Sequence, residues 1–162
     1  MIQVIENFIT PQEETQLLSH LKPSRVVTGF SRNRVYRYGS SLPYKGKTEL
    51  IPIWLSDLCI RVSDQWRSMG FGYVDHVTIN EYHRDQSIDW HIDSKESGPV
   101  ITVLSLESEA LMGLKDKDGT VKVPLPVRSL LHLTDSDRWE REHCIYPVTS
   151  HRWSLVFRKG TK

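Results

Sequence analysis

The stretch VTINEYHRDQSIDWHID, residues 77–93, decides the fold prediction because it contains two short strand-like segments separated by a turn. Val77 and Ile79 alternate with polar residues, which is typical of a strand. Segments of the same kind continue to the end of the chain. The segments predicted as strands are 76–82, 87–93, 100–106, 110–115, 121–125, 129–134, 143–148 and 152–158. This pattern predicts an all-β core with flanking helices (α+β), built as a jelly roll or double-stranded β-helix, and argues against a parallel α/β sheet.

The N-terminal part of the chain has a helical pattern instead. Thr10 is expected to cap a first helix, because Pro11 suits the first helical position and Glu13 follows three residues after the cap. A second helix is expected within 49–66, where large apolar residues recur every four positions from Trp54 to Trp66. We therefore expect two helices outside the strand-rich core.

Composition bounds the class of protein. The 162 residues are 38% hydrophobic and 25% charged, which is ordinary for a soluble globular chain, and two cysteines favour a reducing compartment. No signal peptide is evident at the start, and no apolar stretch approaches the roughly 18 residues that span a bilayer. We expect a cytoplasmic monomer with no membrane partner. The predicted organisation is one domain, 1–162, with residues 1–75 as N-terminal extension and substrate lid and 76–160 as the jelly-roll core.

Charge is unevenly spread along the chain. Residues 22–47 contain seven basic and no acidic side chains, which leaves 14 basic against 20 acidic residues elsewhere. Phe30, Tyr36, Tyr38 and Tyr44 are interleaved with these basic residues. Aromatic and basic side chains together suit a nucleic-acid surface, since rings stack on bases and cations contact phosphates. The alternatives are a solvated loop and ordinary strand aromatics.

His91 and Asp93 share one face of the predicted strand, because side chains alternate between faces. An imidazole beside a carboxylate supplies two ligands of a facial metal site, in which two His and one carboxylate leave other positions open. His143, which follows the predicted loop DSDRWERE at 135–142, is the best third ligand. A His-x-Asp pair alone is a weak signal, and a hydrogen-bonded surface pair is the alternative interpretation.

The last predicted strand carries a second polar set. Arg152, Ser154 and Arg158 share one face by alternation, whereas Trp153, Leu155 and Phe157 share the other. Buried arginines would be costly unless an anion paired with them, and the guanidinium fork matches a carboxylate. Asn80 and Tyr82 form a similar pair on an earlier strand and can donate hydrogen bonds to carboxylate oxygens. The alternative is a pair of solvent-facing arginines on an edge strand.

Together, these motifs resemble the AlkB-like family of Fe(II)- and 2-oxoglutarate-dependent dioxygenases over nearly the whole chain. VTINEYHRDQSIDWHID is similar to the family's metal-ligand block, and VYRYGS to the Tyr-x-Tyr segment of its nucleotide-recognition lid. ENFITPQEETQLLSHL is similar to its opening strand and helix. VITVLSL, VRSLLHLTDSDRWEREHCI and RWSLVFR are similar to its remaining barrel strands.

The resemblance implies an enzyme and a set of residue roles. His91, Asp93 and His143 would hold Fe(II), and 2-oxoglutarate and O2 would be the cosubstrates. Residues that would bind 2-oxoglutarate are Asn80, Tyr82, Arg152, Ser154 and Arg158. Residues that would face the substrate are Arg34, Tyr36, Tyr38 and Lys95. The implied reaction is oxidative demethylation of alkylated DNA or RNA bases, which releases succinate, CO2 and formaldehyde.

Departures from the family pattern leave the substrate open. Lys95 stands where alkylation-repair members have an acid, Glu107 where the family usually has Gly, and Arg141 where some branches have an aromatic residue. VRSLLHLT is more similar to the branch with tRNA-modifying members than to the bacterial repair enzyme. The alternative functions are hydroxylation or demethylation of a protein side chain and a non-catalytic jelly-roll binding module.

Overall fold

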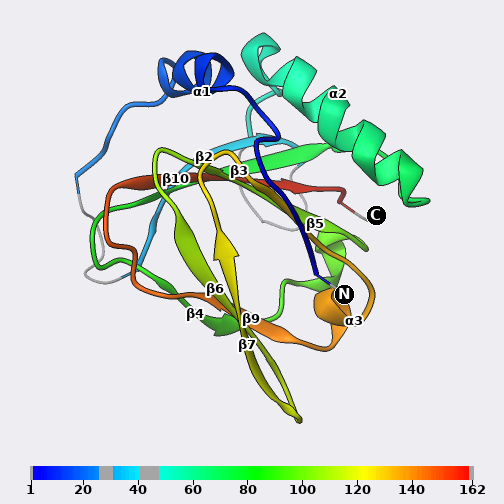
Figure 1. Ribbon diagram of the computed structural model, residues 1–162. Helices are drawn as coiled ribbons and strands as arrows, with labels where there is room; N and C mark the ends of the chain where they lie inside the picture. The colour runs from blue at the N-terminus through cyan, green and yellow to red at the C-terminus, as the bar shows by residue number, and fades with distance from the viewer. Residues whose placement is uncertain (1, 26–30, 41–47, 161–162) are drawn as a thin grey trace.

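The computed structural model describes residues 2–25, 31–40 and 48–160. Two antiparallel sheets face one another, and two helices lie outside the larger sheet (Figure 1). The strands are β1 (Gln3–Ile5), β2 (Asn33–Gly39), β3 (His76–Tyr82), β4 (Ile88–His91), β5 (Ile101–Leu106), β6 (Ala110–Asp116), β7 (Gly119–Leu125), β8 (Leu130–Leu133), β9 (Glu142–Ile145) and β10 (Arg152–Arg158). The helices are α1 (Pro11–Leu18), α2 (Ile53–Ser68), α3 (Asp135–Trp139) and a 3-10 turn η1 (Lys95–Ser97).

The strand order identifies a jelly roll. The larger sheet has the order β1-β8-β5-β10-β3-β2, and the smaller sheet has the order β4-β9-β6-β7. Non-consecutive neighbours show that the chain crosses repeatedly between the sheets. The predicted fold class is therefore confirmed.

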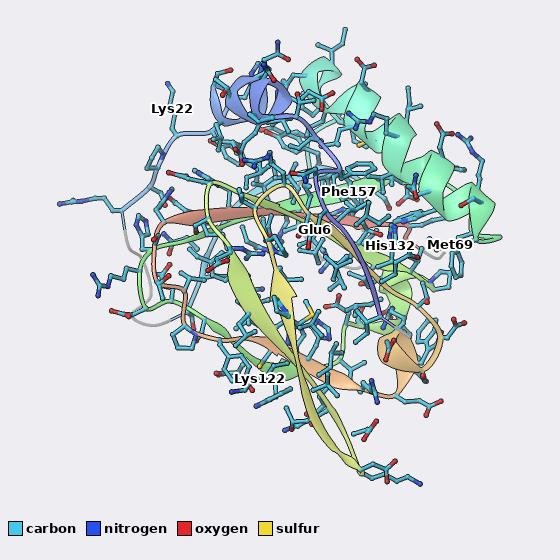
Figure 2. All side chains as sticks on the ribbon, viewed as in Figure 1. Glu6, Lys22, Met69, Lys122, His132 and Phe157 are labelled. Atoms are coloured by element: carbon cyan, nitrogen blue, oxygen red, sulfur yellow. The ribbon has the colours of Figure 1, made fainter. Side chains whose placement is uncertain are left out.

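Two apolar cores hold these layers together. One lies between the larger sheet and helices α1 and α2, and includes Leu55, Trp66, Leu155 and Phe157. Figure 2 shows Phe157 and His132 in this layer. The second core lies between the two sheets and includes Met112 and Val156 among others. The central strands of the larger sheet are therefore buried on both faces, so a polar side chain on either face is desolvated.

A capping residue and a proline explain where the two long helices begin. Thr10 caps α1 in the predicted way: its hydroxyl accepts the Glu13 backbone N–H at 3.1 Å, and Glu13 accepts the Thr10 N–H at 2.8 Å. Helix α2 begins later than residue 49, because Pro52 disfavours helical backbone in the residue before it. No helix among the described residues is long and apolar enough to cross a membrane.

All eight predicted strands are present, with ends that differ by a few residues. Strands β1 and β2 add an edge on each side of the larger sheet. The prediction of a loop over 135–142 was wrong in part, because Asp135–Trp139 forms helix α3. The described part of the predicted lid includes an ordinary strand, β2, paired with β3. Residues 26–30 and 41–47 of that segment, with Phe30 and Tyr44, lie outside the described residues.

Candidate metal centre and cosubstrate pocket

The structure brings His91, Asp93 and His143 together, with one ligand atom of each within 4.8 Å of the others. The sheet register explains how residues so distant in sequence meet. His91 on β4 pairs directly with His143 on β9, and the two ring centroids are 4.2 Å apart. His91 Nε2 lies 3.6 Å from Asp93 Oδ1. The three side chains thus form a facial donor set of two imidazoles and one carboxylate.

Hydrogen bonding prepares these groups to act as ligands. His91 Nδ1 donates to the Asp89 carbonyl at 2.8 Å, which leaves Nε2 directed toward the cluster. Burial alone would raise the pKa of Asp93, but the Arg158 guanidinium, 3.3 Å away, and the neighbouring imidazoles hold that pKa well below its ordinary value. Burial lowers the pKa of His143 to about 4. Near pH 7, Asp93 is therefore ionised and His143 is neutral, as metal ligands must be.

Arg138 on α3 holds the turn that follows Asp93. Its guanidinium donates to the carbonyl oxygens of Asp93, Ser94 and Gly98 at 3.0, 2.6 and 2.8 Å. Arg138 is only 2% exposed. The sequence interpretation missed this residue, because its partners are backbone carbonyls about 40 residues away. Arg138 is therefore a positioning residue for the metal-binding turn, and this role can be seen only in the folded chain.

A cavity of about 230 Å³ lies between the two sheets, beside the metal cluster. Its size suits a small metabolite, since pockets for drug-sized ligands start at about 300 Å³. Apolar side chains from both sheets form part of its wall, and polar side chains form the rest. All eight residues predicted to bind iron or 2-oxoglutarate line it: His91, Asp93, His143, Asn80, Tyr82, Arg152, Ser154 and Arg158.

Arg152 is the unusual member of this lining, because it is fully buried and none of the acidic side chains that the structure describes pairs with it. One guanidinium nitrogen donates to Ser105 Oγ at 2.8 Å, and the guanidinium carbon lies 4.9 Å from the centroid of the Tyr82 ring. Nε and Nη1 have no hydrogen-bond partner, and neither has the buried Oδ1 of Asn80. Burial lowers the pKa of Arg152. A carboxylate against the free guanidinium donors would supply the missing bonds and charge.

The residues predicted to face the substrate are not brought together. Tyr36 and Tyr38 pair with Ile79 and Val77 of β3, so their rings pack on the helix-covered face, next to Trp54. This corrects the expectation that they face the substrate. The physical reason is a register shift between Arg34 and Tyr36, because one extra residue reverses the faces that follow.

The other two residues predicted to face the substrate are Arg34 and Lys95. The backbone of Arg34 pairs with Asn80, and its side chain lies outside the described part of the chain. Lys95 is exposed on η1, next to Ser94, which lines the cavity. Arg32 was not predicted as a site residue, yet it lines the cavity with a buried Nε that has no hydrogen-bond partner. The basic stretch was the available signal for it.

Comparisons with known proteins agree with this geometry. The family model described as the 2OG-Fe(II) oxygenase superfamily matches residues 24–158. The tRNA (carboxymethyluridine(34)-5-O)-methyltransferase ALKBH8 of Macaca fascicularis is 32% identical over 160 residues, which cover 89% of this chain and 24% of that protein. The RNA demethylase ALKBH5 of Xenopus tropicalis is 28% identical over 127 residues, which cover 71% of this chain and 36% of that protein.

A solved structure of OsALKBH1 superposes with a TM-score of 0.71 at 15% identity, covering 98% of this chain and 97% of that one, which supports the fold. The chain spans about a quarter of the length of ALKBH8 and about a third of the length of ALKBH5.

Proposed function

The chain belongs to the 2OG-Fe(II) oxygenase superfamily as an AlkB-like dioxygenase that uses Fe(II), 2-oxoglutarate and O2, and we propose that it oxidatively demethylates alkylated bases of RNA. The observation that carries the proposal is the cavity that joins the His91–Asp93–His143 cluster to the unpaired guanidinium donors of Arg152. The donor set fits Fe(II), and the orphaned donors fit a dicarboxylate.

Each polar side chain of the pocket has a separate role in this proposal. His91, Asp93 and His143 would hold Fe(II), while Arg158 keeps the Asp93 carboxylate ionised and directed toward the cluster. Arg152 would bind the distal carboxylate of 2-oxoglutarate, with Asn80, Tyr82 and Ser154 around it. The apolar walls from both sheets limit the access of water.

Iron and 2-oxoglutarate, when bound by these residues, would supply the oxidising chemistry: one oxygen atom of O2 would end in succinate as CO2 is lost, and the other in a hydroxylated methyl group. On a base nitrogen, that hydroxymethyl group would be lost as formaldehyde. The protein positions the reactants and shields them from water.

Two observations support RNA as the substrate. ALKBH8 and ALKBH5, whose names refer to tRNA and RNA, are both similar to this chain. Arg32 and the exposed Lys95 put positive charge beside the end of the cavity where His91 and Ile92 reach solvent, and cations there would contact phosphates.

The test is a screen of succinate and formaldehyde release with Fe(II), 2-oxoglutarate and matched methylated oligonucleotides of RNA and DNA, with methylated peptides as a third arm. We expect stimulation by RNA, and none in an Asp93→Ala control. Stimulation by peptides alone would instead favour a protein side-chain substrate, and stimulation by DNA alone would overturn the choice of RNA.

A further inference from the structure

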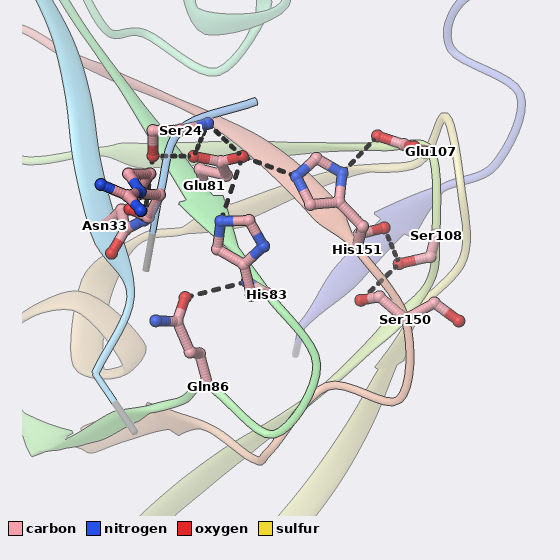
Figure 3. A network of polar contacts seen from close by, with 10 residues as sticks. Ser24, Asn33, Glu81, His83, Gln86, Glu107, Ser108, Ser150 and His151 are labelled. Carbon is pink, nitrogen blue, oxygen red and sulfur yellow. Dashed lines mark hydrogen bonds and ion pairs between the residues drawn. The ribbon is translucent and has the colours of Figure 1, made fainter. Parts of the chain in front are cut away.

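A second cluster of two histidines and one carboxylate lies outside the cavity, where β3 ends and β10 begins (Figure 3). Its members are Glu81, His83 and His151, whose ligand atoms lie within 4.8 Å of one another. None of the three lines the cosubstrate cavity. Glu81 points to the opposite face of β3 from Asn80 and Tyr82, so the cluster is separate from the cosubstrate pocket.

Both imidazoles are directed at one carboxylate oxygen. Glu81 Oε1 is 2.7 Å from His151 Nε2 and 3.4 Å from His83 Nε2, and the Glu81 side chain is completely buried. His83 Nε2 is shielded from solvent, and among the described residues it makes no hydrogen bond besides this longer contact with Glu81. The cluster therefore contains a buried anion and an imidazole nitrogen whose hydrogen-bonding capacity is unused.

Outer contacts already hold this donor set in place. His151 Nδ1 donates to Glu107 Oε2 at 2.8 Å (Figure 3), as carboxylates do behind metal-binding histidines. The neutral tautomer with its proton on Nδ1 would face Glu81 with the lone pair of Nε2. Two lone pairs 2.7 Å apart repel unless a proton or a metal ion lies between them. On its second oxygen, Glu81 accepts from the Ser24 backbone N–H at 3.0 Å and from the Ser24 hydroxyl.

We propose that Glu81, His83 and His151 bind a second divalent metal ion of the zinc type, through Glu81 Oε1 and the Nε2 atoms of both histidines. Two imidazoles and a carboxylate suit Zn²⁺, whose bonds of about 2.0–2.2 Å place tetrahedral ligand atoms about 3.3 Å apart. The His83–Glu81 distance of 3.4 Å already meets this requirement. The His151–Glu81 pair must open by less than about 1 Å.

Such an ion would join the end of β3 to the start of β10. Glu81 is the penultimate residue of β3, His83 directly follows that strand, and His151 immediately precedes Arg152. Glu81 also accepts a hydrogen bond from Ser24, which belongs to the basic segment 22–47. The metal would therefore act as a structural cross-link behind Tyr82 and Arg152. This inference is independent of the proposed substrate.

The experiment is a calorimetric titration of the tag-free full chain with Zn²⁺ at neutral pH after removal of bound metals. We expect two equivalents in the wild type, one in His83→Ala, one in His143→Ala and none in the double variant. His20→Ala is the matched control and should retain both, because His20 lies in neither cluster. Equal stoichiometry in the wild type and His83→Ala would overturn the proposal and leave a protonated His151 between its two carboxylates.

A second variant distinguishes the loss of a metal site from a loss of folding. Glu107→Gln retains all three ligands but weakens the support of His151, so the affinity of the second site should fall by roughly 10–100-fold. In the His143→Ala background, Zn²⁺ should raise the melting temperature in a concentration-dependent way, and adding His83→Ala should abolish that rise. A Zn²⁺-dependent rise that persists without His83, or an unchanged affinity in Glu107→Gln, would contradict the assignment.

Discussion

Strand β10 has two buried faces with opposite chemistry. Trp153, Leu155 and Phe157 face the helices and are at most 2% exposed, whereas Arg152 and Ser154, on the cavity face, are equally buried. Burial of the apolar face stabilises the fold. Burial of an arginine with unpaired donors costs stability, and such a cost is tolerated where a ligand compensates for it. Burial of a side chain therefore does not by itself indicate a functional site, whereas burial of unsatisfied polar atoms does.

The largest expected effect is on the cavity side. His143→Ala removes one of three donors, so 2-oxoglutarate turnover should fall to background. The unfolding free energy should change little, because the buried His143 imidazole makes no hydrogen bond with the other described residues that the substitution would break. Burial lowers its pKa to about 4, so the ring carries no charge at neutral pH. Succinate release and urea denaturation measure the two quantities. Retained turnover would remove His143 from the iron site.

The helix-covered face should show the reverse behaviour. Phe157 is fully buried between the larger sheet and α2 (Figure 2). Phe157→Ala should lower the unfolding free energy by about 3–5 kcal/mol, because the removed ring leaves a cavity. In the fraction that remains folded, the dissociation constant of 2-oxoglutarate should be unchanged. A loss of affinity without a loss of stability would contradict the division of labour between the two faces.

Arg152→Lys sharpens the comparison, because it retains charge but loses the guanidinium fork. We expect roughly tenfold to hundredfold weaker 2-oxoglutarate binding, the equivalent of about 1.5–3 kcal/mol for charge-assisted hydrogen bonds. Stability should not fall by a similar amount, since two guanidinium nitrogens have no partner to lose. Arg128→Lys, at the half-buried ion pair with Glu14 outside the cavity, is the matched control. Equal affinities in wild type and Arg152→Lys would refute the predicted carboxylate clamp.

The sequence predicted these two faces because a strand alternates with period two and β10 contains no irregularity. The substrate-facing role of Tyr36 and Tyr38 came from the family resemblance. The structure packs both rings on the helix-covered face, because of a register shift after Arg34 that cannot be seen in local sequence. His143 was predicted as the third ligand from its place after the predicted loop and then from the family resemblance, but its direct pairing with His91 depends on the register of β4 and β9. Arg138 could not be predicted, because its role depends on backbone carbonyls that only the folded chain brings near it.

The smallest expected effect concerns a titratable group on the helix-covered side. His132 lies in the layer between the larger sheet and α2, where its Nδ1 accepts from the Thr102 hydroxyl, which in turn accepts from Trp66 Nε1, both at 2.7 Å. Burial lowers the pKa of His132 to about 4. The unfolded chain therefore binds a proton near pH 6.5, whereas the folded protein does not until the pH approaches 4.

The sign of the pH effect follows from that difference. The stability linked to His132 is present above pH 6.5 and is lost as the pH falls toward 4. Between pH 7 and pH 5 the loss amounts to about 2 kcal/mol, given 1.36 kcal/mol per pKa unit. His132→Asn removes the titrating group. Between pH 7 and pH 5, the unfolding free energy of this variant should therefore fall by about 2 kcal/mol less than that of the wild type. Urea denaturation of both proteins at the two pH values measures the difference. The other groups titrate equally in both proteins, so the difference between the two proteins reports His132 alone. Parallel profiles of unfolding free energy against pH would show that burial does not keep this histidine neutral.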